Sequence, residues 1–235
     1  MPKSKKSEIF DHVILKFTLG LIVVVFFIGV FFWLAGRFDW IAGWAYIGLL
    51  ICGQGSSTAY LWRKTPDLLK RRGKLGKGTK NWDKFWLVIF GLLFLAILGI
   101  SALDGGRYQW STMPAWLWSI GAILYAFFVF VFTWAMAVNP FFEKTVRIQH
   151  EIGHRVVDSG PYKIVRHPGY TGMIIGLILT TPMLLGSFWA VVPAILAVVW
   201  TVFRTVLEDR TLRLELPGHE DYTQRVPYRL FPGIW

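Results

Sequence analysis

The sequence predicts an all-α integral membrane protein with about six hydrophobic helical segments. Hydrophobic residues make up 54% and aromatic residues 17% of its 235 residues, which is more apolar material than a soluble domain of this size needs. The apolar runs are also long, and about 20 apolar residues suffice for a helix to cross a bilayer. The net charge of +11 comes from basic clusters between these runs. We therefore attribute this charge to orientation in the membrane rather than to nucleic-acid binding.

Residues 1–138 are predicted to form an N-terminal four-helix transmembrane region. Its apolar segments are residues 17–35, 40–61, 85–103 and 115–138. The second half of the second segment is small and weakly polar, which is typical of a helix-packing face. The first segment lacks a small-residue cleavage site after it, so we expect a retained span rather than a signal peptide. The single cysteine, Cys52, excludes an intramolecular disulfide and a zinc–thiolate cluster.

Residues 139–235 form the second predicted region, the core of the candidate site. The apolar stretch 169–203 is too long for one span. We interpret it as a helical hairpin of residues 170–185 and 188–203, kinked at Pro182 and Pro193. The polar tail that follows has helical spacing in its first part. The sequence therefore predicts a kinked hairpin followed by a helical C-terminal tail.

The distribution of basic residues predicts the orientation of the chain. They crowd the N-terminus, the 62–84 loop, the 139–168 segment and the tail. Six crossings would place all four regions on one side, which is cytoplasmic by the positive-inside rule. We thus expect both termini and the candidate site on the cytoplasmic side. For the 62–84 loop, a role in topology is the preferred interpretation, and binding of anionic lipid headgroups is the alternative.

The motif SGPYKIVRHPGYTG, residues 159–172, places cationic side chains at the start of the hairpin. His167 is held extended by the following proline, and Pro168 suits the first position of a helix. Arg204 and Glu208 are four residues apart at the other end of the hairpin. Because the two ends of a hairpin meet, Arg166 and His167 should converge with that pair. Ionisable groups at membrane depth commonly mark a functional site.

The same residues carry a resemblance to a known family. The run GPYKIVRHPGYTG, then RTVLED and PGHEDYTQRVPYRLFPG, resembles the isoprenylcysteine carboxyl methyltransferase family. That family is in turn similar to the membrane phospholipid N-methyltransferases. The upstream GHRVVDSGPY is similar to the family's run before its Gly-Pro-Tyr turn, with Val156 in place of leucine. The resemblance covers residues 139–235.

The resemblance implies an S-adenosylmethionine-dependent methyltransferase without a Rossmann domain. The sequence agrees, because it has no Gly-x-Gly-x-x-Gly turn after a strand. By the resemblance, Arg204 and Glu208 are the catalytic pair. The residues implied to bind the cofactor, or to shape the backbone around it, are His154, Val157, Gly160, Tyr162, Arg166, His167, Pro168, Tyr170, Glu220 and Tyr222. The tail that carries the last two is the expected lid.

The expected acceptor is a hydrophobic or lipid-linked carboxylate, such as that of an isoprenylcysteine. Arg204 can hold a carboxylate at two points, and Glu208 would fix its guanidinium. The chain departs from the family pattern at Asp209, where a second glutamate is commoner, and at Pro217 before the tail glycine. These departures leave the proposed catalytic groups in place.

Three other functions remain open at the level of sequence. One is methylation of a phospholipid amine or a small molecule. Another is an NADPH-dependent membrane reductase of the sterol type, which also has an Arg-His before a helix. The third is a non-enzymatic protein that binds anionic lipid through Lys70 to Lys77. Binding of S-adenosylmethionine rather than NADPH separates the first from the second. The sequence suggests no metal, no nucleic acid and no obligatory protein partner.

Overall fold

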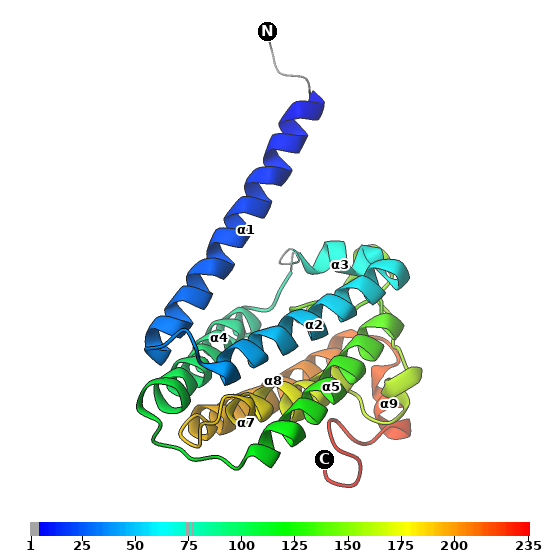
Figure 1. Cartoon of the computed structure of the whole chain (residues 1–235). Coiled ribbons are helices and arrows are strands. Elements are labelled where there is room, and N and C mark those ends of the chain that lie inside the picture. Colours follow the sequence, from blue (N-terminus) through cyan, green and yellow to red (C-terminus); the bar gives the residue numbers. More distant parts are fainter. Residues whose placement is uncertain (1–4, 74–75, 77) are drawn as a thin grey trace.

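The computed structural model describes residues 5–73, 76 and 78–235 (Figure 1). Lys3, Lys74 and Lys77 of the predicted basic clusters lie outside the described residues. Within these ranges the chain is helical and has no strand. The N-terminal helices are α1 (Lys5–Ala35), α2 (Ile41–Lys64), α3 (Pro66–Arg72) and α4 (Asn81–Ser101), which runs into the π-helix η1 (Ala102–Tyr108). The next long helix is α5 (Ala115–Val138). The all-α prediction is confirmed.

The remaining helices belong to the second half of the chain. Two short 3-10 turns, η2 (His150–Ile152) and η3 (Gly160–Lys163), precede the hairpin. The first arm of the hairpin is α6 (Pro168–Met173), the π-helix η4 (Ile174–Ile178) and α7 (Thr180–Leu184). The second arm is α8 (Val191–Glu215), and α9 (His219–Arg225) follows in the tail.

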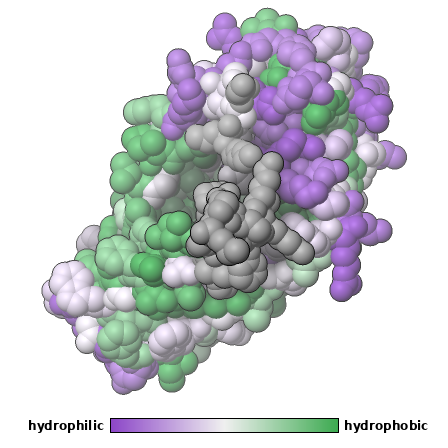
Figure 2. Space-filling view, turned by 90° about the horizontal axis from the view of Figure 1, so that it is seen from above, coloured by the Kyte–Doolittle hydropathy of each residue, from purple (hydrophilic) through white to green (hydrophobic). Residues whose placement is uncertain are grey.

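Four helical segments are long and apolar enough to cross a membrane: 18–35, 81–108, 115–138 and 191–215. The first hairpin arm, residues 168–184, is apolar but shorter. Helix α2 does not qualify, because its second half is rich in Gly, Ser and Thr. The chain therefore has the helices of a multi-pass membrane protein, while the predicted number of six spans is not confirmed. Figure 2 shows most hydrophilic residues gathered towards one end of the molecule, with hydrophobic residues over much of the remaining visible face.

The hairpin packs against α4 and α5, and two close approaches make this possible. Gly176 of η4 lies so near α5 that an added Cβ would stand 2.2 Å from the Leu124 carbonyl oxygen. Gly105 of η1 would meet the carbonyl oxygen of Leu185 at the same distance. Glycine is therefore required at both points, where backbone meets backbone. The contacts fix the hairpin between the N-terminal helices, so the two predicted regions share a core.

The hairpin differs from its predicted form in two ways. The second arm is not half-length, because α8 continues through the tail to Glu215. Pro193 lies in the first turn of α8, where a missing N–H removes no helical hydrogen bond, so the predicted kink there does not break the helix. The first arm is irregular, as predicted. Its π-helical stretch ends at Ile178, four residues before Pro182, whose ring nitrogen cannot donate to that carbonyl.

Candidate active site

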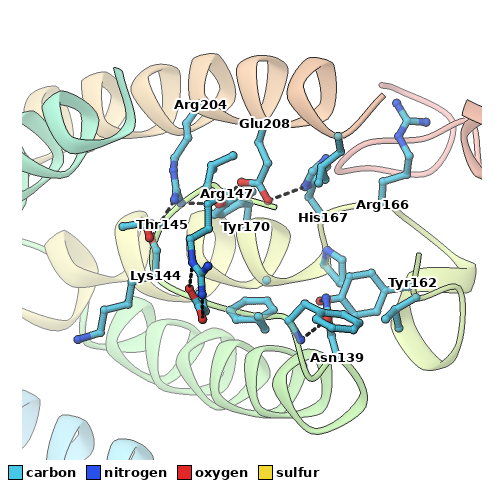
Figure 3. Close-up of a pocket in the computed structure, with 18 of the residues that line it drawn as sticks. Asn139, Lys144, Thr145, Arg147, Tyr162, Arg166, His167, Tyr170, Arg204 and Glu208 are labelled. Atoms are coloured by element: carbon cyan, nitrogen blue, oxygen red, sulfur yellow. Dashed lines mark hydrogen bonds and ion pairs between the residues drawn. The ribbon is translucent and has the colours of Figure 1, made fainter. Parts of the chain in front are cut away.

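A cavity of about 280 Å³ lies at the end of the bundle where the hairpin begins and α8 ends (Figure 3). Its walls come from α4, α5, α6 and α8, from the 139–157 segment, and from the tail. Part of the lining is apolar and aromatic, with Trp86, Phe90, Phe132 and Met173, and we call these residues the apolar wall. The charged and polar lining residues are called the polar wall. This combination suits a small ligand with both apolar and charged parts, since such pockets are mostly apolar with a few placed polar groups.

Asp209 holds one side of the cavity together, because five cationic or imidazole side chains surround it. Its carboxylate accepts from Arg166 Nε at 2.8 Å and from Arg229 Nε at 3.0 Å. His167 Nε2 lies 3.4 Å from it, and Arg213 and His219 lie within 3.7 Å. Only 1% of the Asp209 side chain is exposed. A buried carboxylate with this many partners ties α8, the hairpin start and the tail into one unit.

Arg166 serves mainly to anchor the tail. Its guanidinium donates to both carboxylate oxygens of Asp209 and to the carbonyl oxygens of Val226 and Pro227. Its backbone N–H and that of His167 donate to the carbonyl oxygens of Tyr228 and Arg229, both at 2.9 Å. The tail is thus pinned across the hairpin start. Although Arg166 borders the cavity, it uses four of its donor bonds on protein atoms.

Arg204 has a different partner from the one that its sequence spacing suggests. Its Nε donates to Asp83 Oδ1 at 2.7 Å, and its Nη2 donates to the carbonyl oxygen of Lys144 at 2.9 Å. Nη1 donates to the Tyr170 hydroxyl, which in turn donates to Glu208 Oε2 at 2.6 Å. The predicted direct pairing of Arg204 with Glu208 is therefore wrong. Arg204 and Glu208 are linked through the Tyr170 hydroxyl. The Nε and Nη2 edge of Arg204, which could bind a carboxylate at two points, is occupied by Asp83.

Asp83 shows why this arrangement forms. It lies in the first turn of α4, fully buried, where a carboxylate is favoured by the helix dipole. It also accepts the backbone N–H of Val146 at 2.6 Å, which draws the 139–157 segment over the cavity. The Arg204 guanidinium lies over the Trp86 ring at 4.3 Å. An arginine held by a buried carboxylate and an aromatic face has little freedom to reorient.

His154 borders the cavity in its neutral form. Its Nδ1 accepts the Gln149 backbone N–H at 3.3 Å, so we assign the ring proton to Nε2. Burial, together with the nearby Arg147 cation, lowers the pKa of His154 to about 4. The ring packs on Phe141 with centroids 4.5 Å apart. Beside it, the buried Oε1 of Gln149 has no hydrogen-bond partner. The polar wall thus offers one acceptor without a partner and one imidazole N–H.

Tyr162 and Tyr222 close the cavity on the side of the tail. The Tyr162 hydroxyl accepts from Asn139 Nδ2 at 3.0 Å, and the Tyr222 hydroxyl donates to the Tyr162 carbonyl oxygen at 2.7 Å. Burial raises the pKa of both phenols well above the usual value. Tyr222 thus uses its hydroxyl proton within the protein, whereas the bond from Asn139 leaves the Tyr162 hydroxyl proton for another acceptor.

The comparisons with known proteins fall on the same part of the chain. Residues 121–214 match the family described as the isoprenylcysteine carboxyl methyltransferase family. Most residues around the cavity lie within that range. Over these residues, which are less than half of the chain, the sequence is similar to the isoprenylcysteine carboxyl methyltransferase family. The resemblance seen in the sequence is thereby confirmed.

Three plant proteins are similar to the same region. Protein-S-isoprenylcysteine O-methyltransferase B of Arabidopsis thaliana is 36% identical over 90 residues, which cover 37% of this chain and 44% of the relative. Probable protein-S-isoprenylcysteine O-methyltransferases of Oryza sativa subsp. indica and subsp. japonica are each 34% identical over 88 residues. Those alignments cover 36% of this chain and 45% of each relative. The chain thus spans less than half the length of these relatives.

Most of the predicted site residues border the cavity. They are His154, Val157, Tyr162, Arg166, His167, Pro168, Tyr170, Arg204, Glu208 and Tyr222. Gly160 does not border it. Its positive φ of 58° lets the turn pack on Trp134 and Val138, so it shapes the backbone behind the wall. Glu220 does not border it either, because it lies exposed on the outer side of α9, 3.8 Å from Arg213. Its predicted contact with a cofactor is not supported.

Sequence reasoning missed Asp83 and the full role of Asp209. Asp209 was noticed only as a departure from the family pattern, whereas it pairs with the guanidinium that the motif supplies. Asp83 was included in the basic 62–84 loop without comment. The available signal was an acidic residue in the first turn of a long helix, just before its apolar run, since a buried arginine on another helix requires such a partner.

Proposed function

We propose that the protein is an integral-membrane carboxyl methyltransferase that uses S-adenosylmethionine as methyl donor. The proposed acceptor is the carboxylate of a hydrophobic, lipid-linked group such as an S-prenylated cysteine. One observation carries the proposal. The residues that match the methyltransferase family surround a cavity that is polar on one wall and apolar on the other. The plant relatives are named for the same reaction.

The donor set on the polar wall fits S-adenosylmethionine. The unpartnered Oε1 of Gln149 and the Nε2–H of neutral His154 supply an acceptor and a donor for a nucleoside or an amino-acid group. The aromatic rings of Phe141 and Phe142 also border the cavity and suit a planar base. The surplus of arginine and lysine on these walls suits a carboxylate. We propose that His154, Gln149, Tyr162 and His167 hold the donor.

S-adenosylmethionine, when bound, supplies a methyl group on a sulfonium, and the electron pair of the broken C–S bond stays on sulfur. The acceptor carboxylate is already ionised near pH 7, so no residue has to remove a proton. What the protein has to provide is alignment and exclusion of water. The Arg204–Tyr170–Glu208 chain provides alignment, because it fixes three side chains at the junction of the polar and apolar walls.

The apolar wall suits a lipid chain. Leu87 and Phe90 of α4 and Met173 of α6 border the same cavity as the charged side chains, and α4 is long and apolar enough to cross a membrane. An S-prenylated cysteine whose prenyl chain is bound there would bring its carboxylate to Tyr170. Because basic residues crowd this end of the molecule, we place the site at the cytoplasmic face. Labelling of single cysteines introduced into a Cys52→Ser background, in sealed vesicles, tests this side.

A methyl-transfer assay tests the function. The detergent-purified protein is incubated with S-adenosylmethionine labelled with tritium in the methyl group. The acceptors are N-acetyl-S-farnesylcysteine, its carboxamide, and phosphatidylethanolamine. Base-labile label should appear only on the free acid, since an ester releases methanol in base. Stable label on phosphatidylethanolamine would instead show an N-methyltransferase.

Replacing Glu208 with glutamine sharpens this assay. The variant keeps the side-chain shape and loses the charge that accepts from Tyr170. We expect a folded protein with turnover reduced about tenfold or more, because a charge-assisted hydrogen bond is worth about 1.5–3 kcal/mol. Glu215→Gln is the matched control on the same helix, since Glu215 pairs with Lys80 on the surface. Unchanged turnover in Glu208→Gln would remove Glu208 from the site.

A further inference from the structure

Arg72 borders the cavity but comes from outside the family-matched residues. It is the last residue of α3, a short helix that starts at Pro66 and buries Leu68 against α2 and α5. Two hydrogen bonds hold the end of α3 on the 139–143 segment. Arg71 Nη2 donates to the Pro140 carbonyl oxygen and Arg72 Nη1 donates to that of Phe142, both at 2.7 Å. The position of Arg72 at the cavity is therefore fixed by backbone contacts.

The surroundings of Arg72 are aromatic rather than acidic. Its guanidinium lies 5.3 Å from the centre of the Phe142 ring and 5.9 Å from that of Phe132. Within the part of the chain that the structure describes, no carboxylate lies within ion-pair distance of it. The buried arginines around it are different. Arg147 pairs with Glu143, Arg166 with Asp209 and Arg204 with Asp83.

The charge of Arg72 is thus poorly compensated. Burial lowers its pKa to about 10, and the Arg204 cation adds to this, while Tyr170, Glu143 and Tyr162 act in the opposite direction. All four of these neighbouring side chains also border the cavity. At pH 7 the guanidinium is still protonated. An anion bound next to it would therefore be stabilised more than at a solvent-exposed arginine, because the site has a low dielectric.

Resting on the function proposed above, we propose that Arg72 binds a carboxylate of a ligand in the cavity. Sequence spacing gave this task to Arg204, but Asp83, Tyr170 and Lys144 occupy the guanidinium of Arg204. Arg72 uses one of its five donors on Phe142 and keeps an edge for a ligand. The carboxylate has two sources, the amino-acid end of S-adenosylmethionine and the acceptor. The experiment below distinguishes them.

The test compares wild type with Arg72→Gln, Arg72→Lys and Arg71→Gln. Arg71 is one residue away on α3 and does not border the cavity, so Arg71→Gln controls for loss of one positive charge and one hydrogen bond to the 139–143 segment. Arg72→Lys keeps a charge and a donor for Phe142, so it remains informative if Arg72→Gln fails to fold. For each folded variant, calorimetry gives the Kd of S-adenosylhomocysteine, and initial rates give the KM of N-acetyl-S-farnesylcysteine.

Two outcomes support the proposal, and each identifies a source. In the first outcome, Arg72 binds the carboxylate of the methyl donor. Arg72→Gln then raises the Kd of S-adenosylhomocysteine about tenfold or more, and Arg72→Lys raises it less. The KM of the methyl acceptor changes little. In that case decarboxylated S-adenosylmethionine binds wild type and Arg72→Gln equally. If the acceptor carries the carboxylate, the KM rises and the Kd stays constant. In either case Arg71→Gln remains within about twofold of wild type, because Arg71 does not border the cavity and Glu143, 3.9 Å from it, keeps its closer partner Arg147.

The proposal is overturned if both constants in Arg72→Gln and Arg72→Lys match those of Arg71→Gln. It is also overturned if the decarboxylated probe loses as much affinity as S-adenosylhomocysteine while the KM is constant. Failure of the proposed function looks different, because wild type itself would then neither bind S-adenosylhomocysteine nor transfer methyl groups.

Discussion

The two ends of the helical bundle both bury a carboxylate, yet they do so in different ways. At the end away from the cavity, which we call the closed end, Asp104 of η1 accepts from the Ser111 backbone N–H at 2.8 Å and from the Ser187 hydroxyl at 2.6 Å. These donors are neutral. At the end that contains the cavity, which we call the open end, Asp83 and Asp209 are paired with arginines.

We interpret this difference as that between a structural site and the proposed ligand site. Asp104 is satisfied by hydrogen bonds from its own turn and from the loop between the hairpin arms, so it joins these two connections without a charged partner. The open end carries more cations than its carboxylates neutralise, with Arg72 as the clearest case. A half-buried cation at a cavity without an acid partner is costly to keep, which is why we propose an anionic ligand there. The predictions below test this contrast, starting with the largest expected effect.

Replacing Asp209 with asparagine should disrupt the open end most. The change leaves Arg166 buried without its carboxylate and weakens the attachment of the tail. Breaking a buried pair on one side costs about 3–5 kcal/mol. We expect a large drop in the thermal unfolding temperature in detergent. Asp158→Asn is the control, because Asp158 pairs with Arg225 on the surface. Equal stability of the two variants would contradict the role of Asp209.

Tyr170→Phe should affect the reaction more than the fold. The variant keeps the ring beneath Arg204 and removes the hydroxyl that joins Arg204 to Glu208. We expect turnover to fall about tenfold to a hundredfold, as for other groups that act by positioning. The unfolding temperature should change little. Tyr60→Phe, on the exposed face of α2, controls for loss of a phenol. A Tyr170→Phe enzyme as fast as wild type would show that this link is only structural.

Protonation of His154 should make the open end sensitive to acid. The pKa of His154 is about 4 in the folded protein, below its ordinary value of 6.5. Between these two values the unfolded chain binds a proton that the folded chain does not, so stability is lost as the pH falls. The expected loss between pH 7 and pH 5 is about 1 kcal/mol, because solvent screening at a partly exposed ring reduces the full linkage of about 2 kcal/mol. Unfolding temperatures of wild type and His154→Gln across this range test it.

The control for that titration is His150→Gln, since His150 is exposed on η2. The pH dependence should become shallower in His154→Gln and stay as in wild type in His150→Gln. The same slope in all three proteins would contradict a buried, neutral His154.

Asp104→Asn should give the smallest effect and only on stability. The amide can still accept one hydrogen bond, so we expect a loss of about 1–2 kcal/mol. Binding of S-adenosylhomocysteine per folded molecule should be unchanged, because the closed end does not contact the cavity. Asp39→Asn, in an exposed pair with Arg37, is the control at the same end. Weaker binding in Asp104→Asn would show that the two ends are coupled.

The sequence allowed the helical class, the hairpin and most cavity residues to be predicted, for a common physical reason. The length of the apolar runs determines where the long helices form. A hairpin brings His167 to the level of Glu208 irrespective of the side-chain contacts. Which carboxylate pairs with which arginine depends on contacts between helices that are distant in sequence. Asp83 lies 121 residues before Arg204, so no local spacing points to that pair. The kink expected at Pro193 failed because helix α8 begins only two residues earlier.

The central claim is that the positively charged cavity of the open end binds the methyl donor. Calorimetric titration of the detergent-purified wild-type protein with S-adenosylmethionine, and separately with NADPH, tests it most directly. We predict saturable binding of S-adenosylmethionine at one site per chain, displaced by S-adenosylhomocysteine, and no binding of NADPH. Saturable binding of NADPH by a folded protein that does not bind S-adenosylmethionine would contradict the account.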